Sequence, residues 1–170
     1  MINNNDIYLI DMLDITNRMS EFDVNLSEKK VSSAVLLVQD KNLRDLLGDE
    51  LYFNYLTEYD SGTLSVANSA LRPYIEQYLI AKVCERVVIL IHDQITNKGY
   101  VNQNSDFSVV ANKSDVFRAQ YLYKDDAEFY QNRLFNFLIE NIATYPLYTV
   151  KSYDISANDE PDEEFGMFMI

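Results

Sequence analysis

The fold is decided by residues 65–96, which read SVANSALRPYIEQYLIAKVCERVVILIHDQIT. Apolar side chains recur here at helical spacing, and they predict one long helix that begins between Ser65 and Arg72 and ends near Thr96. Pro73 is tolerable near the beginning, because the first helical N–H groups have no intrahelical partner. A helix that is apolar on two sides is central to its fold or shared between subunits. The two apolar stripes are Ile75, Leu79, Val83, Val87 and Leu90 or Ile91, and Tyr74, Tyr78, Ala81 and Val88.

A second long helix is predicted from about Asp115 to Thr144, with Ser114 as its N-cap. Tyr145-Pro146 ends it, because a residue before proline disfavours the α region. Between the two long helices, residues 100–112 lose the helical period and contain short β-prone pieces, which predict a loop or a small hairpin. The inward stripe of the second helix is Ala119, Leu122 or Tyr123, Ala127, Tyr130, Leu134, Phe137 or Leu138, and Ile142.

Three shorter helices are predicted before the long pair. Gly48 ends the second of them, because glycine favours the conformation that follows a helix. The chain has only four Gly and three Pro, where average usage would give roughly 20, and most of them coincide with predicted helix boundaries. The expected fold is therefore all-α, with two long antiparallel helices and about three short ones. The short helices and their N-caps are residues 27–39 with Ser27, residues 43–47 with Asn42, and residues 50–59 with Asp49.

The acidic charge gathers at both ends of the chain. Acidic side chains number 27 and basic ones 14, for a formal net charge of −13. Residues 1–26 carry five acids against one base, and residues 145–170 carry six against one. We therefore expect an N-terminal arm over residues 1–26, a helical domain over 27–144, and an extended acidic tail over 145–170 with an apolar end. Binding of nucleic acid through phosphate neutralisation is not expected, since the attraction would have the wrong sign.

Residues that could carry catalysis or bind metal are few. Cys84 and His92 are the single cysteine and the single histidine, and they lie roughly 12 Å apart along the helix axis. A metal site would therefore lack ligands, and a thiol nucleophile would lack a base. Asp125, Asp126 and Glu128 follow the pattern of a solvated helix face, and the isolated glycines exclude a phosphate-binding loop. We expect no catalytic residue, no metal, no cofactor and no enzyme activity.

Targeting features are also missing from the sequence. One cysteine cannot form an internal disulfide, so a reducing compartment is the default. The longest aliphatic run, Val87–Ile91, is far too short for a membrane span. The segment Met1–Asp6 lacks the basic start of a signal peptide. We expect no contact with a membrane.

Aromatic and terminal apolar residues indicate protein contacts. The chain has 13 Tyr, and tyrosine is enriched at interfaces because it buries area at little entropic cost. The alternative is that some of them line the core with the hydroxyl at the surface. Residues 165–170 are apolar and follow an acidic spacer, so this end either docks on a neighbour or is disordered. The candidate contact residues are Tyr74, Tyr78, Tyr100, Phe107, Phe165, Met167, Phe168, Met169 and Ile170.

The order of several short motifs resembles a family of tailed-phage head–tail connector proteins, of the kind found in crAss-like and other phages of Bacteroidales-type bacteria. A joint between two short helices, of the form LLG-(D/E)-x-L-Y, is carried here by Leu46, Leu47, Gly48, Leu51 and Tyr52. The resemblance covers about residues 20–142, and the N-terminal arm and the tail depart from it. The other motifs are Phe22-Asp23-Val24-Asn25, Arg72-Pro73-Tyr74-Ile75, Asn97-Lys98-Gly99-Tyr100-Val101, Ser105-Asp106 and Asp125-Asp126-Ala127-Glu128-Phe129-Tyr130.

The resemblance implies a non-enzymatic structural protein of the virion. Such connectors form rings, typically of twelve copies, that dock under the portal at the capsid vertex, extend the DNA channel and present a platform to the next ring or tail protein. DNA would pass through the negative lumen without specific binding. The protein would lie in the neck of the virion, and in the host cytoplasm during assembly. The loop between the long helices would face the lumen or the portal through Asn97, Lys98, Gly99, Ser105 and Asp106.

Two other interpretations stay open. The chain could form a tail-completion or terminator ring in the same neck. It could also be an intracellular acidic helical protein-binding module, such as an adaptor or a mimic of nucleic acid. A ring of about twelve copies favours the connector, whereas a strict monomer that competes with DNA favours the mimic.

Overall fold

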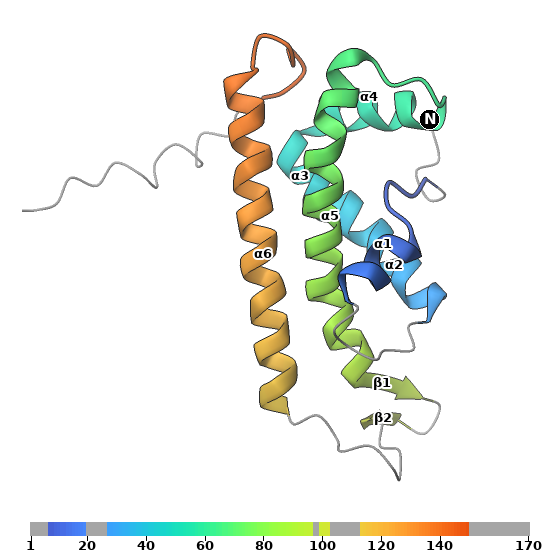
Figure 1. Cartoon of the computed structure of the whole chain (residues 1–170). Coiled ribbons are helices and arrows are strands. Elements are labelled where there is room, and N and C mark those ends of the chain that lie inside the picture. The colour runs from blue at the N-terminus through green and yellow to red at the C-terminus, as the bar shows by residue number, and fades with distance from the viewer. Residues whose placement is uncertain (1–6, 20–26, 97–98, 103–112, 150–170) are drawn as a thin grey trace, which may run out of the picture.

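The protein is an all-α body built on two long antiparallel helices (Figure 1). A computed structural model describes residues 7–19, 27–96, 99–102 and 113–149. Helix α5 (Val66–His92) lies at the centre, and helix α6 (Lys113–Glu140) packs along one side of it. Helices α1 (Met12–Arg18) and α2 (Glu28–Val38) pack on α5 as well, and α6 is not among their main contacts. The described body therefore has three layers, with α5 in the middle.

Helix α5 is buried on two sides, as its two apolar stripes predict. Ile75, Leu79, Val83 and Val87 are fully buried, and the second stripe contributes Tyr78 among its buried members. The predicted end near Thr96 is wrong, because the helix ends at His92 and the chain continues as a strand.

Pro73 lies farther from the start of α5 than predicted. It is the eighth residue of the helix and not part of the first turn, so its ring removes the N–H that would bond to Ser69. Both residues are exposed, so water can replace the missing bond.

The segment between the long helices begins with a two-stranded antiparallel hairpin. Strand β1 (Asp93–Thr96) pairs with strand β2 (Gly99–Asn102), and the pairing of Thr96 with Gly99 leaves a two-residue connection. This hairpin is not the one predicted within residues 100–112, because its first strand comes from the predicted end of the long helix and only the second strand overlaps the predicted segment. Residues 103–112 lie outside the described residues.

The three short helices are joined more tightly than predicted. Helix α2 continues through a π-helical segment, η2 (Gln39–Leu43), into α3 (Arg44–Leu47), so Asn42 is not an N-cap. Gly48 ends α3 at a φ of 77°, as predicted, and is itself the N-cap of α4 (Asp49–Asp60). Asp49 therefore lies in the first turn of α4, where its carboxylate accepts a hydrogen bond from the Arg44 guanidinium at 2.8 Å. The helix dipole favours an acid at this place.

The N-terminal segment is not a free arm where the structure describes it. Residues 7–19 pack on the body and bury Leu9, Ile10, Ile15 and Met19. Two acids that the charge count assigned to an arm form a capping box at the start of α1, since Asp11 and Asp14 each accept a hydrogen bond of 2.9 Å from the other's backbone N–H. These two carboxylates cap the N-terminus of α1. The predicted arm over residues 1–26 is therefore wrong for residues 7–19, which pack on the body.

The buried side chain of Gln39 holds this segment in place. Its amide nitrogen donates to the carbonyl oxygen of Ile7 at 3.0 Å, and its amide oxygen accepts from the N–H of Leu9 at 2.9 Å. The Gln39 amide thus pairs with one backbone acceptor and one backbone donor of this segment.

The end of α6 returns to the body instead of leading directly into a tail. The helix ends at Glu140, four residues before the predicted Thr144, and Ile142 is exposed where an inward position was predicted. Tyr145 and Tyr148 are buried, and the Tyr145 hydroxyl donates to the carbonyl oxygen of Ala67 at 2.7 Å. Residues 145–149 therefore belong to the body, and residues 150–170 lie outside the described residues.

Candidate interaction surface

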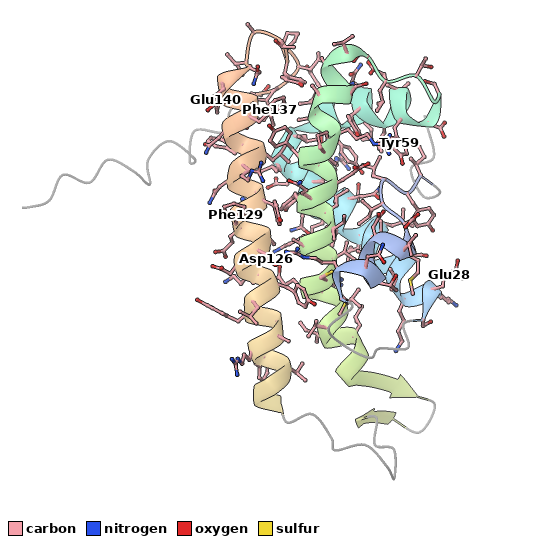
Figure 2. The ribbon with its side chains drawn as sticks, viewed as in Figure 1. Glu28, Tyr59, Asp126, Phe129, Phe137 and Glu140 are labelled. Atoms are coloured by element: carbon pink, nitrogen blue, oxygen red, sulfur yellow. The ribbon has the colours of Figure 1, made fainter. Side chains whose placement is uncertain are left out.

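The outward side of α6 exposes large apolar side chains. Phe117, Tyr121, Leu122 and Phe129 keep 65%, 68%, 58% and 57% of their surface exposed. In Figure 2, Phe129 points away from α5, whereas Phe137 lies toward it. Scattered single apolar residues are normal on a surface, but several along one helix make a candidate contact site. We call these four residues the α6 outer stripe.

The inward side of α6 packs against the body and holds the helix in place. Ala119, Tyr123, Ala127, Leu134 and Leu138 are buried against the body, which confirms these members of the predicted inward stripe. The ring of Phe137 stacks on Tyr74 of α5 with centroids 4.2 Å apart and planes 20° apart. The inward face therefore positions the helix without any help from the outer stripe.

An ion pair connects α6 to α1 near the middle of α6. The Arg18 guanidinium of α1 contacts the Asp126 carboxylate, and its carbon lies 5.9 Å from the centroid of the Tyr130 ring. Both charged side chains are about 40% exposed, so the pair contributes little energy by itself. The ion pair gives α6 a contact with α1, in addition to its packing on α5.

Asp125 gives the outer stripe a charged centre. Tyr121, Asp125 and Phe129 are spaced by four residues, so they follow one another along the same face of the helix. Neighbouring charges are already engaged, since Lys124 pairs with Glu128 at 3.6 Å and the Arg133 guanidinium lies 5.8 Å from the Phe129 ring. Asp125 itself has no ion pair within the part of the chain that the structure describes.

The predicted joint proves to be part of the core. Leu47, Leu51 and Tyr52 are buried, and Leu46 is partly buried against the same cluster. Burial raises the pKa of the Tyr52 hydroxyl to about 12, with a smaller contribution from the Asp40 charge. These residues pack in the core and so serve the fold.

The predicted contact residues divide into three groups. Tyr78 is 2% exposed and belongs to the core, so its assignment as a contact residue is wrong. Tyr74 is half-buried and stacks on Phe137 within the same chain. Gly99 and Tyr100 lie in β2, for which the structure describes the backbone only. The remaining predicted residues lie outside the described residues: Asn97, Lys98, Ser105, Asp106, Phe107, Phe165, Met167, Phe168, Met169 and Ile170.

The outer stripe as a unit was missed by the sequence analysis. Leu122 was offered as an alternative to Tyr123 on the inward side, and only Tyr123 is buried. The signal was present, because Phe117, Tyr121 and Phe129 keep a spacing of four and eight residues that is out of phase with the inward stripe.

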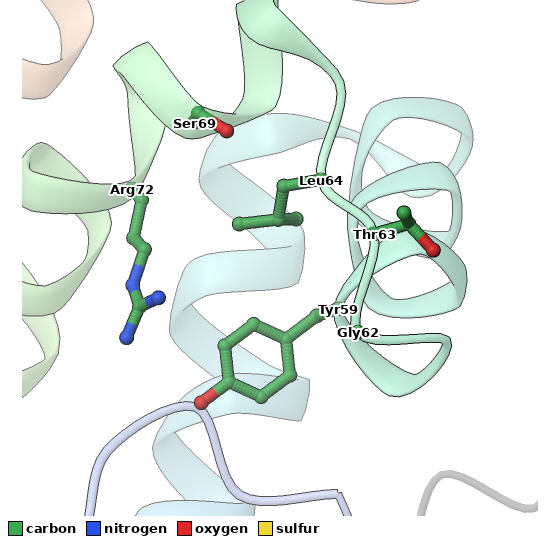
Figure 3. Close-up of a pocket in the computed structure, with 6 residues that line it drawn as sticks. All are labelled: Tyr59, Gly62, Thr63, Leu64, Ser69 and Arg72. Atoms are coloured by element: carbon green, nitrogen blue, oxygen red, sulfur yellow. The ribbon is translucent and has the colours of Figure 1, made fainter.

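A pocket of about 600 Å³ opens at the corner between α4 and α5. Figure 3 shows Tyr59, Leu64 and Arg72 around the same space. The Arg72 guanidinium lies 5.8 Å from the centroid of the Tyr59 ring, and its Nε donates to Glu76 at 2.6 Å. The rest of the lining is Gly62, Thr63 and Ser69, so the pocket holds no pair of nucleophile and base.

The described residues also lack a metal-binding cluster, a membrane-spanning helix and a reactive thiol. Within them, no three His, Cys, Asp or Glu side chains come together as a metal site would require, and no helix is long and apolar enough to span a membrane. Cys84 is fully buried, and burial raises the pKa of its thiol to about 12. The thiol therefore stays protonated, which is the form that does not attack.

Comparison with known proteins places the chain in a family. The profile of DUF6712, a family of unknown function, matches residues 43–157. The chain belongs to this family. The matched part of the DUF6712 chain begins at the last residue of η2 and takes in α3 to α6, including the outer stripe. No curated protein and no solved structure matches the chain. Since the family has no known function, the connector role stays a prediction.

Proposed function

We propose that this DUF6712 protein is a non-enzymatic structural protein of a tailed-phage virion that assembles into a ring, of about twelve copies, as a head–tail connector. In this role the ring lies under the portal at the capsid vertex, continues the DNA channel and carries the next neck or tail ring. Copies gather from the host cytoplasm during assembly. A terminator ring in the same neck would use the same surfaces.

The α6 outer stripe is the observation that carries the proposal. A helix that packs on the body through one side and shows four large apolar residues on the other is stable in water but favours association. Tyr and Phe dominate the stripe, and aromatic residues are enriched in the buried centres of protein interfaces. A net charge of −13 further suits a conduit that DNA must pass without adhering to the wall.

Particle mass tests the proposal directly. The full chain of 19.8 kDa is purified, and its assembly is measured by mass photometry and by negative-stain electron microscopy. We expect closed rings of about twelve copies. Tyr121→Lys together with Phe129→Lys places charge in the stripe and should lower the assembled fraction at least tenfold. Gln131→Lys is the control for an added lysine, since it places one at an exposed position of the same helix away from the stripe.

A strict monomer at all concentrations would overturn the ring. If that monomer also displaced DNA from a DNA-binding protein, the acidic mimic would take the place of the connector. Rings that assemble equally well with the lysine pair and with the control would remove the stripe from the contact.

A further inference from the structure

The layer that covers α5 on the side away from α6 also has an exposed outer face. Helix α2 buries Val31, Ala34, Val35 and Val38 against the body. Helical spacing leaves a second set of residues on the opposite side of α2. This α2 outer face consists of Lys29, Lys30, Ser33 and Leu37, all of them exposed.

Two of these residues are cations that no carboxylate neutralises within the described residues. Lys29 has no ion pair there, and the Lys30 ammonium reaches only the carbonyl oxygen of Leu90 at 3.4 Å. Glu28 precedes them in the first turn of α2, where the helix dipole already stabilises its charge. The α2 outer face therefore offers cations on long apolar stems beside Leu37.

The α6 outer stripe is the chemical complement of that face. Its centre is Asp125, which has no ion pair within the described residues, between the exposed rings of Tyr121 and Phe129. A lysine that approaches this site can pair with the carboxylate while its stem covers an aromatic ring. Leu37 can pack on the remaining apolar residues of the stripe.

The two surfaces also lie at matching positions along the molecule. In Figure 2, Glu28 at the start of α2 and Asp126 of α6 lie at nearly the same level on opposite sides of α5. Two copies that stand side by side with parallel long helices would therefore bring the α2 outer face of one copy to the α6 outer stripe of the next. No shift along the axis is needed.

We infer that the α6 outer stripe binds the α2 outer face of a second copy of this chain, a head-to-tail contact in which Lys29 and Lys30 meet Asp125. Because the two faces differ, every copy keeps one of each free after it binds a neighbour, and the series ends only when it closes on itself. The inference rests on the proposed ring and names its contact surfaces.

Site-specific cross-linking distinguishes this contact from others. Ser33→Cys and Asn132→Cys place thiols on the two faces at exposed polar positions, and the native Cys84 is buried. Co-expressed copies of the two variants are assembled and treated with a bismaleimide. We expect cross-linked dimers in the mixture, none with either variant alone, and a ladder up to ring size when one chain carries both cysteines. Wild-type protein is the control for Cys84.

Charge exchange gives a second measurement. Lys29→Asp and Asp125→Lys should each weaken assembly roughly tenfold, and the chain that carries both should recover most of it, because attraction is restored with the signs reversed. Cross-links of Asn132→Cys alone would show a two-fold α6–α6 contact and overturn the inference. Rings without a mixed cross-link would overturn it and leave the proposed function standing, whereas absence of any assembly would overturn the proposed function itself.

Discussion

The hydroxyl of Tyr145 donates a hydrogen bond to the carbonyl oxygen of Ala67, 2.7 Å away, and so connects the segment after α6 to the first turn of α5. The two residues are 78 positions apart in the sequence. Phe137 lies beside this contact. The centroid of its ring is 5.8 Å from that of the Tyr145 ring and 4.2 Å from that of the Tyr74 ring. One end of the long helix pair is thus closed by an aromatic cluster and a single polar bond.

Removal of that bond tests its share of the stability. Tyr145→Phe keeps the ring and loses the donor, so we expect the free energy of unfolding to fall by about 0.5–1.5 kcal/mol. Urea denaturation followed by circular dichroism measures the change. Tyr121→Phe is the control, because that hydroxyl is exposed on the outer stripe. An equal loss in both variants would mean that the Ala67 bond contributes nothing specific.

Gln39 should control the docking of the N-terminal segment. Gln39→Leu keeps the volume but leaves the carbonyl of Ile7 and the N–H of Leu9 without a partner, at an expected cost of about 1–3 kcal/mol. We expect amide exchange over residues 9–19 to accelerate far more than exchange in α5. Hydrogen exchange with mass spectrometry resolves the two regions, with Gln77→Leu on the exposed side of α5 as control. Uniform acceleration over both regions would argue against a local role.

Glu58 should make stability depend on pH. Its carboxylate accepts hydrogen bonds from the backbone N–H of Ser65 and from the side chain of Asn68, both at 2.8 Å, and the Ser65 bond lowers the pKa of Glu58. A lowered pKa in the folded state means that the stabilisation is present above the unfolded pKa and is lost as pH falls through the folded one.

The Glu58→Gln variant tests this dependence. We expect it to be less stable than wild type at pH 7, and the difference should shrink as pH falls below the ordinary glutamate range. Chemical denaturation between pH 7 and pH 3 measures both chains, and Glu50→Gln, an exposed position of the same helix, corrects for the loss of one charge. A difference between wild type and Glu58→Gln that stays constant with pH would contradict the assignment.

Pro73 should be a destabilising residue for the isolated chain. Pro73→Ala restores an N–H that can bond to Ser69, and proline inside a helix costs about 3 kcal/mol relative to alanine. Proline also restricts the unfolded chain, which offsets part of that cost. We therefore expect a gain of about 2 kcal/mol and a higher Tm by scanning calorimetry. A lower Tm would show that the ring of Pro73 makes packing contacts that outweigh the missing bond.

The long helices were predictable because their signal is long and periodic. Helical spacing continues over many turns in both stripes, from Ile75 to Val87 and from Ala119 to Leu138. Most of their members are buried as that spacing predicts. Gly48 was predictable for another reason, since its φ of 77° is a conformation that few other residues adopt.

The misplaced features all depend on contacts that sequence spacing does not contain. Asn42 has the chemistry of an N-cap, yet packing of Leu43 keeps the chain helical through that position. Asp11 and Asp14 were assigned to a charged arm. In the structure they form the start of α1, a helix that buries Ile15 against the body. Leu122 and Tyr123 are neighbours of similar hydrophobicity, and only the rotation of α6 against α5 decides which one is exposed.

The π-helical segment Gln39–Leu43 acts as a phase shift within a continuous helix. A regular α-helix that buries Val31, Val35 and Val38 would next turn Asn42 inward, but one additional residue per turn brings Leu43 there instead. The same widening lets Gln39 follow Val38 into the core, where it recognises the backbone of residues 7–9. Deletion of a single residue in this segment would restore the ordinary pitch, and the body would lose its anchoring point for the N-terminal segment while keeping its composition almost unchanged.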